Sequence, residues 1–177
     1  MRSRRSILLL VGLSVAAVPV PFFAAIDHKL AVMWFAAVSL AVAYAAYRRF
    51  IGQELVVALL FALFVTSYQE YAYTSANVYL GRINLFPLIG WTAGLVLLRE
   101  AYENLRMSNR FVVISAIYIF VLFTLEYVGY HVLGIRIAGD MPSLFGLGII
   151  HGPPIIHWFY VLAGPVYLLV TDYLRVK

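Results

Sequence analysis

Six apolar stretches, each near the roughly 20 residues that a helix needs to cross a bilayer, leave this chain few possible folds. They cover about residues 6–26, 30–47, 54–73, 83–98, 111–133 and 154–170. Soluble domains average about 25% charged residues, whereas this chain of 177 residues is 12% charged and 64% hydrophobic. The sequence therefore predicts an all-α fold, a polytopic membrane bundle of about six transmembrane helices, in a single domain over residues 1–177.

The lysines and arginines divide unequally between the two sides of this predicted bundle. With a cytoplasmic N-terminus, only Lys29, Arg82 and Arg136 of the 13 basic residues face outward. The other ten face the cytoplasm: Arg2, Arg4, Arg5, Arg48, Arg49, Arg99, Arg106, Arg110, Arg175 and Lys177. Basic residues accumulate on the cytoplasmic side of membrane proteins, so both termini are predicted to be cytoplasmic. Topology also explains the net charge of +5, and we expect no nucleic-acid partner.

The compact architecture and the short basic tails indicate a multi-pass protein of a prokaryotic cell membrane. The first stretch ends in Phe22-Phe23-Ala24-Ala25, which has some features of a signal-peptide cleavage region. Because further spans follow, we expect an uncleaved first helix. No cysteine is present, which excludes disulfides and cysteine-held metal clusters.

Glycine and proline interrupt the chain before the sixth stretch, at Gly146, Gly148, Gly152, Pro153 and Pro154. We interpret residues 144–150 as a short re-entrant or interfacial segment. Irregular backbone at membrane depth must be buried in protein or line a cavity, so this segment predicts a cavity near His151.

Two pairs of stretches carry similar short motifs. In the third and fourth stretches, Glu70-Tyr71 precedes Pro87-x-x-x-Trp91, and in the fifth and sixth, Glu126-Tyr127 precedes Pro154-x-x-x-Trp158. The pattern is consistent with a parallel repeat of helices 3–4 and 5–6, although motifs this short also recur by chance. Repeat interfaces in transporters commonly hold binding sites.

Four ionisable residues near the outer side are the candidate catalytic groups: Glu70, Glu126, His151 and His157. Ionisable groups in membrane spans are costly and mark functional sites by default. An apolar, aromatic setting favours the protonated carboxyl group, which could then act as a general acid. Alternatively, each glutamate bonds a tyrosine, an arginine or the backbone of a neighbouring helix.

The same region could hold a metal ion, with ligands drawn from Glu70, Glu126, His131, His151 and His157. Paired histidines on facing helices could instead hold a haem. A third alternative is that these histidines bond nearby backbone or carboxylate groups. The leading interpretation requires no cofactor.

Aromatic and polar residues on the same side are the candidate substrate-binding groups: Trp91, Trp158, Tyr71, Tyr127, Arg82 and Asn84. Ring faces can stabilise cationic species, and arginine can bind an anionic group. Against this, tryptophan and tyrosine also form interfacial belts, and Arg82 could be an ordinary loop residue. On the cytoplasmic side, Arg99, Glu100, Glu103 and Arg106 have the spacing of a salt-bridged helix end.

The stretch from Glu126 to Trp158 resembles part of the carotenoid hydratase family that includes bisanhydrobacterioruberin hydratase. The matching positions are Glu126, Gly129, Gly134, Pro154 and Trp158, and they cover about a third of the chain. The family's Pro-Phe-Gly and tyrosine run after Gly134 is missing here. The resemblance implies a lyase- or isomerase-type enzyme of carotenoid biosynthesis, which hydrates or cyclises a lipid-soluble isoprenoid after protonating an alkene.

Three function classes therefore remain. The leading hypothesis is a membrane enzyme whose partner is a membrane lipid or isoprenoid substrate, with His151 or His157 as the base that activates water. The second is a small proton-coupled transporter, suggested by the repeat and the broken segment. The third is an accessory subunit of a larger membrane complex, and a homo-oligomer is also consistent with the sequence.

Overall fold

The computed structural model describes residues 12, 17–47, 51–68, 71–74 and 77–175. Residues 6–11 and 13–16 of the first apolar stretch, residues 6–26, lie outside the described residues. Glu70, a candidate catalytic and metal-binding residue, also lies outside them. Of the Glu70-Tyr71 motif of the proposed repeat, the structure therefore describes Tyr71.

The described chain is mostly helical, as the sequence predicts. It forms six α-helices: α2 (Val20–Ile26), α3 (His28–Tyr47), α4 (Ile51–Tyr68), α5 (Leu85–Asn104), α6 (Arg110–Tyr127) and α7 (Pro154–Arg175). The shorter elements are the paired strands β1 (Tyr79–Leu80) and β2 (Ile83–Asn84), a π-helix (Val128–Val132) and a 3₁₀ turn (Leu144–Gly146). The 3₁₀ turn occupies the start of the segment that we expected to be re-entrant or interfacial.

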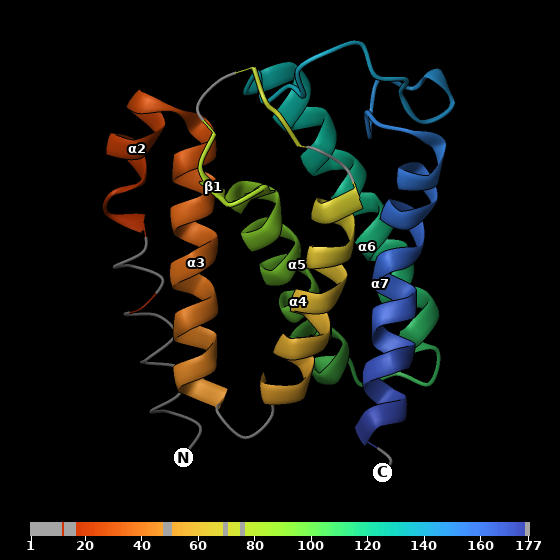
Figure 1. The fold of residues 1–177 in the computed structure, drawn as a ribbon. Helices are drawn as coiled ribbons and strands as arrows, with labels where there is room; N and C mark the ends of the chain where they lie inside the picture. Colours follow the sequence, from red (N-terminus) through yellow and green to blue (C-terminus); the bar gives the residue numbers. More distant parts are fainter. Residues whose placement is uncertain (1–11, 13–16, 48–50, 69–70, 75–76, 176–177) are drawn as a thin grey trace.

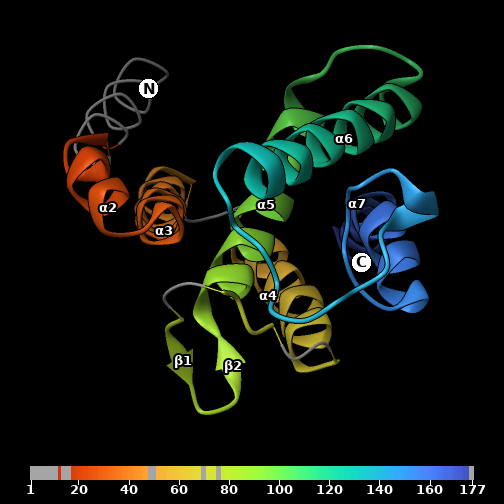
Figure 2. The ribbon, with the colours of Figure 1, turned by 90° about the horizontal axis from the view of Figure 1, so that it is seen from above.

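The long helices stand side by side, and consecutive ones run in opposite directions (Figure 1). The β-hairpin and the segment 128–153 lie together at one end of the bundle, which we call the hairpin end. The connection between α5 and α6 lies at the opposite end, which we call the ion-pair end. Viewed along the helices, α5 lies between α3, α4 and α6, and it also contacts α7 (Figure 2).

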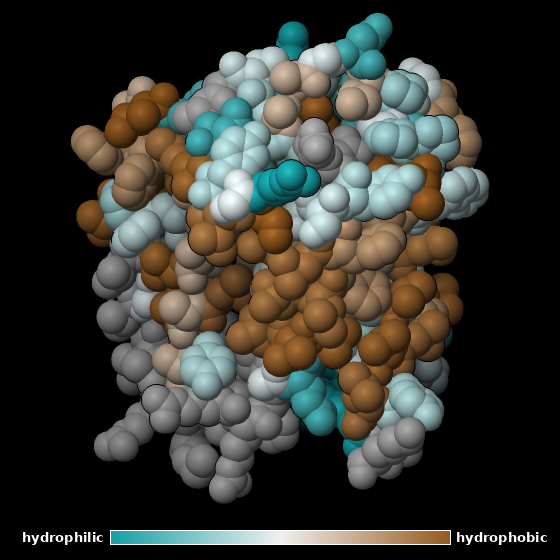
Figure 3. Space-filling view, viewed as in Figure 1, coloured by the Kyte–Doolittle hydropathy of each residue, from teal (hydrophilic) through white to brown (hydrophobic). Residues whose placement is uncertain are grey.

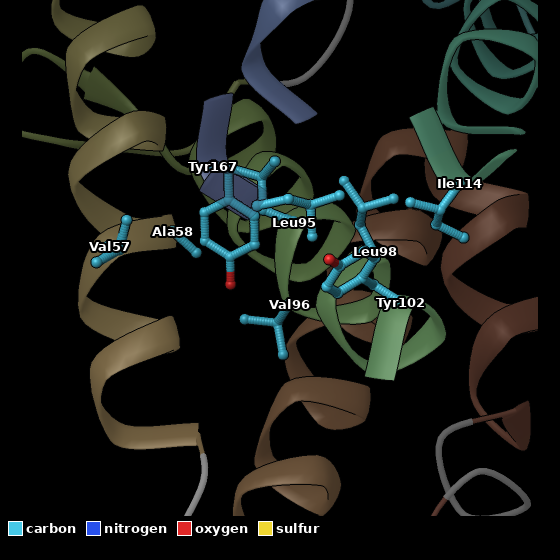
Figure 4. Close-up of a cluster of buried hydrophobic side chains, with 9 residues drawn as sticks. Val57, Ala58, Leu95, Val96, Leu98, Tyr102, Ile114 and Tyr167 are labelled. Atoms are coloured by element: carbon cyan, nitrogen blue, oxygen red, sulfur yellow. The ribbon is translucent and has the colours of Figure 1, made fainter. Parts of the chain in front are cut away.

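The main apolar core lies where α5 meets α4 and α7. It contains Val57, Ala58, Leu95, Val96, Leu98, Tyr102, Ile114, Tyr167 and Leu168 (Figure 4). Tyr167 is fully buried and donates a hydrogen bond of 3.1 Å to the backbone carbonyl of Glu54. A buried hydroxyl needs such a partner, and here the bond joins α7 to α4.

Two helical stretches, Arg110–Val132 and Pro154–Arg175, are long and apolar enough to cross a membrane. Core helices of soluble proteins can match them in length and composition, so these two helices alone are weak evidence of membrane association. Only 6% of the most apolar window of Arg110–Val132 is buried. Figure 3 shows apolar residues across the middle of one face, with more polar residues toward both ends.

The ion-pair end is held by charged side chains from α4, α5 and α7. Arg99, only 2% exposed, contacts Asp172 at 2.6 Å and Glu103 at 2.8 Å. Arg175 contacts Glu103 at 3.0 Å and donates a hydrogen bond of 2.6 Å to Glu54. The expected helix-end ion pair between Arg99 and Glu103 is confirmed, and it belongs to a network that ties three helices together.

A second constraint joins α6 to α7 through Tyr118. Its hydroxyl donates to the backbone carbonyl of Tyr160 at 2.5 Å. A Cβ at Gly164 would lie 2.7 Å from the Tyr118 ring, so glycine is what allows the ring to approach. Pro165 follows within the helix and supplies no backbone N–H. The Tyr118 hydroxyl thus bonds a backbone carbonyl of α7 in the turn before a proline.

We predict that Gly164→Ala destabilises the fold by about 1–3 kcal/mol, because the added methyl group overpacks the contact with Tyr118. Gly94→Ala is the matched control, since a Cβ at Gly94 meets nothing within 4 Å. Helix propensity makes the control neutral or slightly stabilising. Thermal unfolding of the two purified variants measures the difference. Equal stability would contradict the close contact between Gly164 and the Tyr118 ring.

We predict that Arg99→Ala destabilises the fold by about 1–3 kcal/mol. This is less than the roughly 3–5 kcal/mol expected for a fully buried pair, because its acidic partners keep solvent contact. The side chains of Glu103 and Asp172 are 34% and 38% exposed. Arg106→Ala, at an exposed arginine of the α5–α6 connection, should change stability by no more than about 0.5 kcal/mol. Denaturant unfolding of both variants tests the contrast.

Candidate functional site

The candidate site lies at the hairpin end, where the segment after α4 meets the segment after the π-helix. Thr74 N–H donates to the carbonyl of Arg136 at 3.0 Å, and Ala138 N–H donates to the carbonyl of Ala72 at 2.6 Å. The side chain of Asn84 donates to the carbonyl of Tyr71 at 2.8 Å. These bonds bring three distant parts of the chain together and fix the backbone on which Tyr71 sits.

A cluster of aromatic side chains fills the interior below this backbone. The hydroxyl oxygens of Tyr71 and Tyr160 lie 3.0 Å apart in a hydrogen bond. Trp91 packs against the same cluster and meets the Tyr160 ring edge-on, with centroids 4.7 Å apart. Tyr73 stacks on Tyr71 at 6.2 Å. Two predicted substrate-binding residues, Trp91 and Tyr71, therefore belong to one cluster.

Glu126 lies in the last turn of α6 and faces this cluster. Its carboxyl group is close enough to act electrostatically on four tyrosines: Tyr71, Tyr73, Tyr118 and Tyr160. Within the part of the chain that the structure describes, Glu126 forms no ion pair and no hydrogen bond. The site is therefore a single carboxyl group beside a wall of aromatic rings. We call this arrangement, with Trp91, the tyrosine–Glu126 site.

The π-helix Val128–Val132 begins two residues after Glu126. π-Helices are rare and frequently occur at functional sites. This one carries Tyr130 and His131 away from the aromatic cluster, toward the loop that precedes α7. Within this one irregular turn, the chain therefore leads from Glu126, which lies beside the aromatic cluster, to His131, which bonds the loop before α7.

Three histidines hold backbone carbonyl groups at the hairpin end. A ring nitrogen donates from His28 to Leu133 at 3.0 Å, from His131 to Gly148 at 2.9 Å and from His157 to Pro142 at 3.2 Å. Carbonyl oxygens only accept, so each of these nitrogens carries a proton. For His131 and His157, the structure shows the alternative in which these histidines bond backbone groups. Among the described residues, no group of three potential ligands is placed to hold a metal ion.

His151 stacks on Tyr130, with ring centroids 3.8 Å apart and planes 10° apart. Burial lowers the pKa of the His151 imidazole below its ordinary value of 6.5, and the positive charges of His131, His157 and Arg136 lower it further. Arg136 also lies over the Tyr130 ring, with its guanidinium carbon 5.0 Å from the centroid. The structure shows the His151 ring against Tyr130, and the cavity expected near His151 stays a prediction.

The remaining predicted substrate-binding residues lie outside the aromatic cluster. Tyr127 and Trp158 are exposed on the outer surface of the bundle. Arg82 is exposed in the turn between β1 and β2. Asn84 is buried and caps α5 by accepting from Phe86 N–H, so its contacts are structural. Since Trp91 packs inward and Trp158 points outward, the two Pro-x-x-x-Trp motifs occupy different environments.

Sequence reasoning did not single out Tyr118, Tyr160 or Lys29. The first two lie in apolar helices, where a tyrosine that faces the interior has the same sequence pattern as an interfacial one. Lys29 is only 2% exposed and lies over the Tyr73 ring, with its Nζ 4.8 Å from the centroid. Its salt bridge to Asp27, two residues earlier, spans 3.8 Å. In the sequence, the nearby Asp27 was the only hint that Lys29 is not an ordinary solvent-exposed loop residue.

No family model matches this chain, and neither a curated protein nor a solved structure is similar to it.

We predict that the loop 142–152 loosens as the pH falls below about 6.5. The unfolded loop binds a proton more readily than the folded one, because the pKa of His151 is lowered in the fold. Stability therefore falls as the pH falls through and below the ordinary value of 6.5. Hydrogen exchange of the loop amides, corrected for intrinsic rates, should rise over this range. His151→Phe keeps a stacked ring and should flatten the rise, and an unchanged profile would assign the effect to another group.

Proposed function

We propose that this protein is a membrane-embedded enzyme that protonates an alkene of a lipid-soluble isoprenoid, with Glu126 as the general acid. The observation that carries the proposal is the position of Glu126, which has no counter-ion among the described residues and lies near four tyrosines. The stretch from Glu126 to Trp158 resembles part of a carotenoid hydratase family, and this resemblance points to the same chemistry.

The proposal includes a six-span topology with the ion-pair end in the cytoplasm. Its support is the distribution of surface chemistry. The outer faces of α6 and α7 present large exposed apolar side chains such as Phe120, which is 73% exposed, and soluble monomers rarely expose apolar patches of this extent. The ion pairs of Arg99 and Arg175 gather at one end and the histidines at the other, while the excess of basic residues orients the bundle.

In this topology the substrate reaches Glu126 from the lipid. The Glu126 side chain is half-buried, and its neighbours along the helix, Leu125 and Tyr127, are exposed on the outer surface. A polyene lying along α6 would therefore meet the carboxyl group at the level of the aromatic cluster, without passing through water.

The proposed reaction begins when the Glu126 carboxylic acid donates its proton to one carbon of the alkene. The π electrons form the new C–H bond, the second carbon becomes a cation, and Glu126 becomes a carboxylate. In hydration, a water molecule adds to the cation and its surplus proton returns to Glu126. In cyclisation, a second alkene attacks the cation, and loss of a neighbouring proton to Glu126 restores the acid.

The aromatic wall supplies the second requirement, which is stabilisation of the cation. Ring faces attract cations, by about 2 kcal/mol or more when water is excluded. Tyr160, Tyr71 and Trp91 are held in place by their mutual contacts and by Tyr118. Because Glu126 itself can take the proton back, the reaction does not need His151 or His157 as a base. Both histidines have structural contacts at the hairpin end.

We predict that Glu126→Gln lowers product formation by about 10²–10⁴-fold, the usual contribution of a general acid. The assay uses proteoliposomes that contain an acyclic carotenoid polyene in deuterated water. Product from the wild-type protein should carry solvent deuterium on carbon, detected by mass spectrometry. Hydration also adds the mass of water, whereas cyclisation adds only the replacement of one hydrogen by deuterium. Asp140→Asn, at an exposed carboxylate of the same end, is the control and should leave the rate unchanged.

Incorporation of deuterium that survives Glu126→Gln would contradict the assignment of the acid. Absence of any product, combined with proton-dependent movement of a solute that requires Glu126, would favour the transporter hypothesis instead. An absorption spectrum of the gently purified protein comes first, because a bound polyene shows a structured visible band and identifies the substrate class directly.

A further inference from the structure

The loop 142–152 holds two large apolar side chains outward on a firmly fixed base. The backbone N–H of Leu144 donates to the carbonyl of Ile149 at 2.9 Å, and Gly152 N–H donates to the carbonyl of Pro142 at 3.0 Å. His131 and His157 bond further carbonyls of the loop. Leu144, Ile149 and Ile150 are buried in the core. Between these anchors, Phe145 and Leu147 are exposed, and we call these two residues the apolar tip.

Phe145 is both strained and exposed. Its φ of 48° lies in the left-handed region, and 79% of the residue is accessible. This conformation costs a non-glycine residue roughly 1–2 kcal/mol, and the exposed ring adds little packing to offset that cost. Backbone strain of this kind persists where it serves a function, here the outward presentation of the ring.

The apolar tip continues along the chain into the outer surface of α7. Ile155 and Trp158 are exposed in the first turns of that helix, followed by Leu162, Val166 and Leu169. Tryptophan is enriched at the headgroup level of membranes. Trp158 therefore places the start of α7, and the loop that precedes it, near the headgroup level.

Arg136, a cationic side chain, lies at the base of the same loop beside two histidines. Arg136 and His151 both contact Tyr130, and His131 bonds the loop carbonyl of Gly148. In the described residues, Arg136 forms no ion pair with a carboxylate. Its guanidinium group suits a phosphate, to which arginine can donate two parallel hydrogen bonds.

We propose that this end of the molecule binds phospholipid: the apolar tip enters the outer leaflet, and Arg136 contacts a lipid phosphate at its base. An apolar tip beside a cationic base matches the acyl chain and the phosphate of a lipid. The proposal rests on the membrane topology given above, and it is independent of the reaction assigned to Glu126.

The absence of cysteine from the chain allows a clean test with nitroxide labels. Single cysteines are introduced as Phe145→Cys, Asp140→Cys and Phe120→Cys, and each labelled protein is placed in vesicles of phosphatidylcholine and phosphatidylglycerol. Electron paramagnetic resonance then compares collisions with oxygen, which enters lipid, and with a water-soluble nickel chelate. The label at 120, midway along α6, reports the topology, and the label at 140 reports an exposed polar position of the hairpin end.

The expected result is a lipid environment at 120 and 145 and a water environment at 140. A label at 145 that is as accessible to the chelate as the label at 140, with 120 in lipid, would overturn the insertion of the tip. A label at 120 in water would overturn the membrane topology, and the tip proposal with it. Neither labelling result depends on catalysis. The activity of Glu126→Gln therefore tests the proposed reaction independently of the membrane insertion.

The phosphate contact has its own test. Spin-labelled phosphatidylglycerol and phosphatidylcholine report how much of each lipid is immobilised by the unlabelled protein. Arg136→Gln should remove the preference for the anionic lipid, whereas Arg82→Gln, at an exposed arginine of the same end, should keep it. Equal loss in both variants would show a general effect of charge and overturn a specific contact with Arg136.

Discussion

The site depends on how α6 is attached to the rest of the bundle, because α6 carries Glu126 and buries very little of its own surface. Tyr118 supplies the attachment in the middle of the helix, where Gly164 leaves room for its ring and the carbonyl of Tyr160 accepts its hydroxyl. The same Tyr160 bonds Tyr71 through its own hydroxyl. One side chain of α6 therefore fixes both the distance between α6 and α7 and the position of an aromatic residue beside Glu126.

Polar side chains have different kinds of partner at the two ends of the molecule. At the ion-pair end, Arg99 and Arg175 face three carboxylates across α4, α5 and α7, so charge compensates charge. At the hairpin end, polar side chains mainly satisfy backbone groups of irregular segments, as His131 does for Gly148. The result is a rigid, charged base opposite an end whose shape depends on loops. Glu126 lies near the second end, where irregular backbone can bring side chains from several segments together.

The sequence predicted the helices well because the length of an apolar stretch and the basic residues at its ends are local features of the chain. It also identified Glu126, Tyr71 and Trp91, which the structure brings to one site. It could not separate Trp91 from Trp158, since identical Pro-x-x-x-Trp motifs place one ring inward and the other outward. Nor could it identify Tyr160, whose position depends on the rotation of α7 set by Tyr118. His131 and His157 looked like ligands because their carbonyl partners, Gly148 and Pro142, lie 17 and 15 residues away along the chain.

The π-helix links the two proposals physically while leaving them separable. Glu126 precedes it by two residues, and His131, within it, bonds the loop that carries Phe145. A force on that loop therefore acts on the turn next to the carboxyl group. If the apolar tip lies in the leaflet, the lipid surface fixes the depth of this turn, and with it the level at which Glu126 meets a substrate dissolved in the same bilayer. A hydrogen-bonded loop suits that task better than a mobile one, because depth is set by whatever is rigidly connected to the acid.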